Sequence, residues 1–117
     1  MDERPDIDIA AFRARLVAER TALQDDSAAR AGDRAPVVLD QQSVSRLSRA
    51  DAMQVQEMAT ATERRRHQRL RRLDAALARL ETEEFGWCTI CGGEIAAARL
   101  DSDATVPTCI DCARGAT

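Results

Sequence analysis

Apolar residues recur at helical intervals in two separate stretches of the chain. In the first stretch they are spaced by three, four and seven positions, the rhythm of a narrow coiled-coil seam: Ile9, Phe12, Leu16 and Leu23. Asp6 or Asp8 can cap the start of this helix, and Gly32 can end it. The pattern therefore predicts a first helix over about 6–29.

The second stretch is longer and predicts a helix over about 45–83. Its start is open between Ser43 and Ala50, because three serines in that range can each act as a cap. Its apolar positions fall into two groups: Val55 and Met58, then Leu70, Leu73, Leu77 and Leu80. Residues 60–69 between the groups offer almost nothing apolar to bury, and the FGWC sequence at 85–88 breaks the helical pattern.

Residues 30–44 connect the two helices, and we read them as a loop because they lack a helical period. Two seam-type helices with a short connection favour an antiparallel hairpin. The predicted fold class is therefore mainly α, with a helical hairpin or coiled-coil arm over 1–84 and a small C-terminal finger over 85–117. The pairing register is open, since the first seam can meet 70–77 or lie nearer Val55 and Met58.

Composition changes this picture in three ways. Aromatic residues make up 3% of the 117 residues and charged residues 32%, which argues against a thick core. The net charge of −3 argues against a protein that coats nucleic acid. No apolar run approaches the roughly 18 residues of a membrane span, and the acidic start MDERPDIDIA does not resemble a signal peptide. We therefore expect a cytoplasmic protein whose thiols stay reduced.

The four cysteines form two CxxC pairs, 17 residues apart, in the spacing of a four-cysteine zinc site: Cys88, Cys91, Cys109 and Cys112. Four thiolates complete a zinc tetrahedron and leave no open position, so one structural Zn²⁺ is predicted. The alternative is thiol redox chemistry, but the βαβ pattern of such proteins is absent from the sequence. His67 lies in an arginine-rich helical stretch, and we expect it to be a solvated residue and not a ligand.

The finger residues closely resemble the DksA/TraR family of bacterial zinc-finger transcription regulators. The shared elements are FGWCTICGGEIAAARL and the closing CIDCA. The resemblance implies a non-enzymatic protein that binds RNA polymerase, inserts its hairpin into the secondary channel, and does not bind DNA directly. It also implies acidic residues at the hairpin tip and leaves guanosine tetraphosphate as a further candidate ligand.

The tip departs from the family pattern Asp-x-x-Asp-x-Ala. Counted back without gaps, that pattern falls on Ser45, Ser48 and Ala50, so only the alanine agrees. Asp51, followed by Ala52, is our first candidate for the tip carboxylate, and Asp40 is the second. The competing interpretation of Asp51 is a solvated acid in the first turns of a helix.

Six arginines lie within 63–72, and at about 100° per residue three of them share one face: Arg65, Arg69 and Arg72. The resemblance places Arg65 and Arg72 on basic positions that hold guanosine tetraphosphate at the polymerase interface. Arg66 should instead point toward the apolar face. The simpler interpretation is a solvated face paired with acids across the hairpin, where each pair contributes about 0–1 kcal/mol.

One alternative function remains open at this point. The chain can be a zinc-ribbon adaptor that pairs with another protein, or a module that homodimerises through its exposed seam. We expect a monomer more than a dimer.

Overall fold

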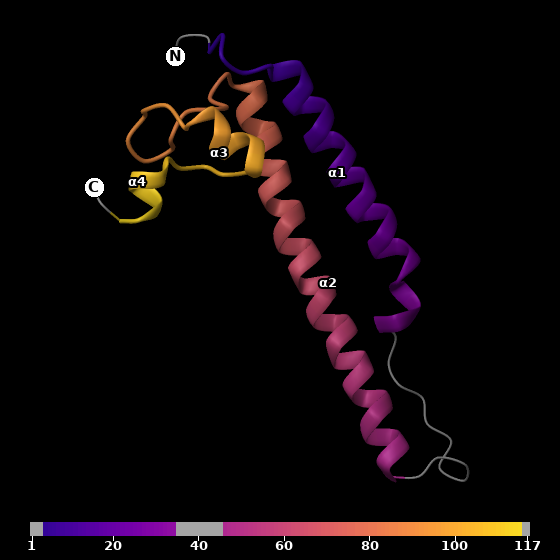
Figure 1. Ribbon diagram of the computed structural model, residues 1–117. Helices are drawn as coiled ribbons and strands as arrows, with labels where there is room; N and C mark the ends of the chain where they lie inside the picture. Colours follow the sequence, from indigo (N-terminus) through magenta and orange to yellow (C-terminus); the bar gives the residue numbers. More distant parts are fainter. Residues whose placement is uncertain (1–3, 35–45, 116–117) are drawn as a thin grey trace. The chain divides into compact units, whose positions relative to one another are not determined.

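The computed structural model describes residues 4–34 and 46–115, and the side chains of 4–32 and 49–115. Its elements follow in the order α1 (Ile9–Ala29), the 3₁₀ helix η1 (Ala31–Arg34), α2 (Arg46–Glu81), α3 (Ala97–Ser102) and α4 (Ile110–Ala113) (Figure 1). Over the described residues the only β pairing is an isolated bridge between Trp87 and Glu94. The predicted mainly α fold class is confirmed.

The helix ends differ from the predicted ones by a few residues. α1 begins at Ile9 because Asp8 is its cap: the Asp8 carboxylate accepts a 3.0 Å hydrogen bond from the Ala11 N–H. Asp6 instead pairs with Arg4. The loop predicted over 30–44 starts with η1, which contains Gly32, and its remainder from 35 lies outside the described residues.

α2 ends at Glu81 through a tight C-terminal turn that needs a left-handed residue. The Glu84 N–H donates to the Arg79 carbonyl at 2.9 Å, and the Glu83 N–H donates to the Leu80 carbonyl at 3.4 Å. These two bonds form a Schellman motif, whose left-handed position is usually glycine. Here it is Glu83, with φ of 63°. The motif redirects the chain into the FGWC segment.

The described chain divides into two compact units. The first comprises Met1–Thr21 with Leu70–Thr117, and the second comprises Ala22–Arg69. α1 and α2 each contribute to both units. The prediction of an arm over 1–84 and a finger over 85–117 stays a prediction.

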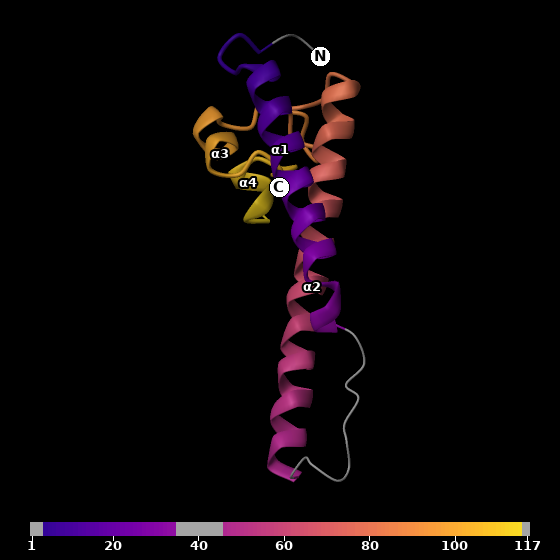
Figure 2. The same cartoon turned by 90° about the vertical axis from the view of Figure 1, so that its right-hand side faces the viewer.

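The first unit contains the apolar core. Within it the N-terminal half of α1 runs antiparallel to the C-terminal half of α2, and the segment that carries α3 and α4 completes it (Figures 1 and 2). The fully or almost fully buried apolar side chains here are Phe12, Leu16, Leu73, Ala76, Leu80, Phe85, Ile95, Leu100 and Ala104. The helix seams and the finger thus share one core.

Ion pairs and ring contacts in the first unit settle the register that the sequence left open. Arg20 pairs with Asp74 at 2.7 Å and Arg13 with Glu81 at 3.4 Å. The ring of Phe12 lies 5.3 Å from that of Phe85, centroid to centroid. The N-terminal seam therefore meets the leucines around Leu73, and not Val55 and Met58.

Candidate functional site

The first cysteine pair lies in a turn held by backbone hydrogen bonds. The Cys88 N–H donates to the Gly93 carbonyl at 2.8 Å, and the Gly92 N–H donates back to the Cys88 carbonyl at 3.0 Å. Gly92 has a φ of +74°, a left-handed conformation that glycine adopts without strain. The turn exposes Cys91 and buries Cys88.

The second cysteine pair opens the short helix α4. The Cys109 sulfur caps this helix by accepting a hydrogen bond from the Cys112 N–H at 3.5 Å. The two pairs are joined by backbone, because the Thr89 N–H donates to the Pro107 carbonyl at 2.9 Å. A short loop interaction therefore keeps both cysteine pairs on one side of the finger.

All four cysteine sulfurs lie within 4.8 Å of one another, and the Cys91 and Cys109 sulfurs are 3.8 Å apart. A zinc tetrahedron with bonds of about 2.3 Å has edges of about 3.8 Å, so the cluster fits the ion. The four cysteines are free thiols, and among the described residues they form the only cluster suited to a metal. The chain thus carries one structural Zn²⁺ with four protein ligands and no open position.

Backbone N–H groups stabilise the thiolate form of Cys88. They lower the pKa of the Cys88 thiol to about 6, the N–H of Cys91 having the largest effect. Burial, together with the neighbouring sulfurs, raises the pKa of the Cys112 thiol. The N–H of Gly93 also points at the Cys91 sulfur, at 3.4 Å. One shared four-sulfur site favours metal binding over two independent dithiols.

Arg4 supports the finger and was missed in the sequence analysis. Its guanidinium is almost completely buried, with the side chain 2% exposed. It donates to the carbonyl oxygens of Gly86 and Ile95 and lies over the Trp87 ring, 6.0 Å from the centroid. The Arg4 side chain packs closely against Gly86, since a Cβ at that position would lie 3.3 Å from it. No periodic pattern in the sequence marks this residue.

The candidate tip residues lie in the second unit or outside the described chain. Asp51 is exposed and Ala52 half-buried, both near the start of α2. Asp40 lies outside the described residues. Asp51 is therefore the candidate for which the structure gives a position.

The three candidate arginines have different surroundings. Arg65 is exposed and donates to the Thr62 hydroxyl at 3.1 Å, while Arg69 is half-buried; both belong to the second unit. Arg72 belongs to the first unit and pairs with Asp103 at 2.9 Å. The three arginines therefore share one predicted helix face but differ in exposure and in their partners, so they are not equivalent candidates for binding a ligand.

His67 is 59% exposed and contacts Glu63, with its Nε2 2.9 Å from a carboxylate oxygen. It belongs to the second unit, whereas the cysteines belong to the first. The prediction that His67 is not a zinc ligand stays a prediction.

Fold and site together define a small helical protein stabilised by a C4 zinc finger. The sequence pattern of the prokaryotic dksA/traR C4-type zinc finger matches residues 83–117. The RNA polymerase-binding transcription factor DksA of Escherichia coli K12 is 31% identical over 107 residues, which cover 89% of this chain and 68% of that relative. The chain belongs to the DksA/TraR family of zinc-finger transcription regulators.

Two further similarities agree with this assignment. The RNA polymerase-binding transcription factor DksA of Haemophilus influenzae is 42% identical over 43 residues, which span 37% of this chain and 30% of that relative. The structure of transcription factor DksA2 from Pseudomonas aeruginosa superposes with a TM-score of 0.75, covering 92% of this chain and 81% of that one. At 23% identity the latter likeness shows the fold. Over the described residues, no helix has the length and apolar character that a membrane crossing requires.

Proposed function

We propose that this protein binds RNA polymerase through its secondary channel and regulates transcription without catalysing a reaction. The observation that carries the proposal is the similarity over 89% of the chain to a relative named for binding RNA polymerase. A four-cysteine zinc site supports a structural role for the metal, because it offers no position for substrate. This role would place the protein in the cytoplasm, as a monomer that does not bind DNA directly.

Asp51 is the proposed tip carboxylate, with Ala52 beside it. Its exposure on α2 leaves the carboxylate available to a partner. Asp40 remains the second candidate on sequence grounds alone.

Arg65 and Arg69 are proposed to contact the polymerase, and guanosine tetraphosphate is the candidate co-ligand. Guanidinium groups suit phosphate because they donate paired, charge-assisted hydrogen bonds. Arg72 would have to exchange Asp103 for such a partner. A surface pair of this kind contributes only about 0–1 kcal/mol, so the exchange would cost little.

The test is co-purification of the full chain with bacterial RNA polymerase, followed by transcription assays. Asp51→Asn should retain binding and lose most of the transcription effect, because it removes the charge without changing the shape. Glu57→Gln is the matched control, since Glu57 is also an exposed acid on α2 of the second unit. Absence of binding at micromolar concentration would overturn the proposal. An effect that only Asp40→Asn abolishes would move the tip to Asp40.

A further inference from the structure

The second unit buries a charged side chain in place of an apolar seam. Where its side chains are described, at 22–32 and 49–69, Glu63 is the buried one, at 7% exposed. Val55 and Met58 of the same unit are 64% and 63% exposed. Apolar packing therefore does little to fix how α1 and α2 pair within this unit.

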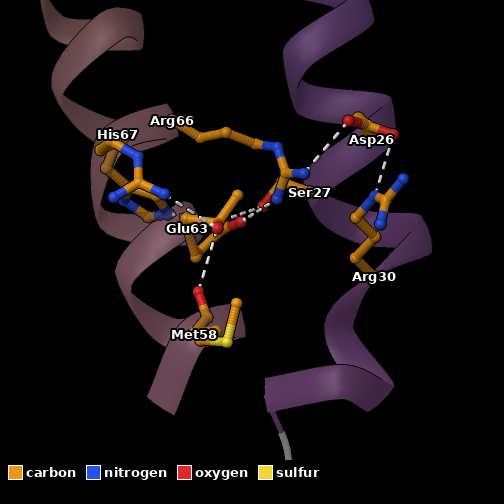
Figure 3. Close-up of polar contacts among 9 residues, drawn as sticks. Asp26, Ser27, Arg30, Met58, Glu63, Arg66 and His67 are labelled. Atoms are coloured by element: carbon orange, nitrogen blue, oxygen red, sulfur yellow. Dashed lines mark hydrogen bonds and ion pairs between the residues drawn. The ribbon is translucent and has the colours of Figure 1, made fainter. Parts of the chain in front are cut away.

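Glu63 connects the two helices through a continuous set of polar contacts (Figure 3). Its carboxylate, on α2, accepts a hydrogen bond from the Ser27 hydroxyl on α1. Arg66 donates to the other carboxylate oxygen at 2.8 Å and also pairs with Asp26 of α1 at 3.2 Å. Arg66, 12% exposed, thus points toward the partner helix as its helical angle predicts.

The charges along this set of contacts alternate in sign. Arg30 pairs with Asp26 at 3.5 Å, Asp26 with Arg66, and Arg66 with Glu63, which His67 also contacts at 2.9 Å. Each charge therefore has an opposite neighbour, and the members come from both helices (Figure 3). The arrangement is specific to one alignment of Ser27 with Glu63.

A buried carboxylate discriminates between alignments more sharply than apolar contact does. A slip of one residue turns a helix face by about 100°, which would separate Glu63 from Ser27. The carboxylate would then either be buried without a partner, at high cost, or turn to solvent and break the pairing. Single buried polar residues set the register of coiled coils in this way, at some cost in stability.

We propose that Glu63 is a positioning residue whose contact with Ser27 fixes the register of α1 against α2 in the second unit. The same unit carries Asp51, so the register also determines where that carboxylate lies. This last consequence rests on the proposed function, whereas the register claim does not.

The register can be measured by distances between spin labels at Ala22 and Gln54, both exposed positions of the second unit. When Ser27 lies level with Glu63, these two positions are offset by about 21 Å along the helix axis, so a slip changes their distance almost in full. Labels on introduced non-natural side chains leave the zinc thiols unmodified. The wild-type chain should give one narrow distance distribution. Glu63→Leu should add a second population in which α1 has slipped by one helical turn and the label distance differs by about 5 Å. The melting temperature of Glu63→Leu should fall, since the substitution removes one partner of a buried ion pair and leaves Arg66 with Asp26.

Two further variants separate a positioning role from a merely structural one. Glu63→Gln should keep the single distance distribution of the wild-type chain, because the amide oxygen can still accept a hydrogen bond from the Ser27 hydroxyl. Glu57→Leu, an apolar replacement at an exposed site of the same helix, should leave the distribution unchanged. A single, wild-type distribution in Glu63→Leu would overturn the register claim, and so would a Glu63→Gln distribution as broad as that of Glu63→Leu.

Transcription assays test the consequence for Asp51. Glu63→Leu should bind polymerase with nearly wild-type affinity, within about threefold or 0.7 kcal/mol, and lose most of its effect. Full effect in that variant would overturn the consequence. If the wild-type chain fails to bind polymerase, the proposed function fails while the distance distributions still decide the register claim.

Discussion

The guanidinium of Arg4 donates a 2.8 Å hydrogen bond to the carbonyl oxygen of Gly86, 82 positions further along the chain. A second donation from the same group reaches the Ile95 carbonyl. Both carbonyls belong to the finger, on either side of the first cysteine pair. The Gly86 carbonyl also accepts a hydrogen bond from the Ile95 N–H at 2.9 Å. The N-terminal segment therefore adds charge-assisted hydrogen bonds to two carbonyls of the finger.

Arg4→Ala should destabilise the protein by about 2–4 kcal/mol, because two buried carbonyls lose charge-assisted hydrogen bonds. Urea unfolding followed by circular dichroism measures this loss. Arg64→Ala is the control, an exposed arginine whose removal should change the free energy of unfolding by at most about 0.5 kcal/mol. Equal effects of the two substitutions would contradict the role given to Arg4.

Asp6 should titrate below the usual range of an aspartate. The hydrogen bond from Arg4 is the main cause that lowers the pKa of this carboxyl from its ordinary 3.8. The ion pair therefore stabilises the folded state fully above the pKa of the unfolded chain, and this contribution is lost as pH falls through the lower, folded pKa. Carboxyl titration by NMR measures the value, and Arg4→Ala should return it to the ordinary one. An unchanged titration in that variant would assign the shift to another cause.

Glu83→Gly should stabilise the protein by about 1 kcal/mol, since a non-glycine residue in the left-handed region costs on the order of 1–3 kcal/mol. The position is the left-handed one of the Schellman motif, with φ of 63°. Thermal unfolding should show the increase. The control is Glu84→Gly, at a site without positive φ, where the added freedom of the unfolded chain should lower stability by up to about 1 kcal/mol. A loss at Glu83 equal to that at Glu84 would refute the strain.

Zinc removal should unfold the finger, because the apparent binding energy of a structural zinc site, roughly 10 kcal/mol or more, is also folding energy. Atomic spectroscopy should find one zinc per wild-type chain, and a chelator should lower the melting temperature. Cys112→Ser should reproduce the chelated state. His67→Ala should keep its full zinc content, and loss of the ion in that variant would mean that the ligand set is wrong.

Local patterns made the metal site and the helices predictable. The CxxC spacing identifies all four ligands, and the leucine interval around Leu73 identifies the helix face that forms the core. The position of Glu83 was not predictable, because left-handed helix ends usually contain glycine and this one does not. The error at the predicted start of α1 came from two equivalent aspartates, of which only Asp8 reaches the helix N–H groups.

Contacts between distant positions were beyond sequence reasoning. Arg4 is a single basic residue in an acidic segment, and its role depends on carbonyls more than 80 positions away. Glu63 sits in the polar stretch 60–69, and its burial follows from the pairing register, which that stretch leaves undetermined. In both cases the residue type is compatible with ordinary solvent exposure, so only the three-dimensional arrangement distinguishes it.

The dependence of the finger on Arg4 also limits how this protein can be dissected. The segment that matches the zinc-finger pattern of the family is 83–117. Arg4, which donates two hydrogen bonds to this segment, lies outside it. An excised peptide of that length would keep every sulfur and the hydrogen bond from the Ile95 N–H to the Gly86 carbonyl, but would lose both hydrogen bonds that Arg4 donates. Shortening at the far end of the chain, or a bulky fusion placed there, would thus weaken a module that begins some eighty residues away.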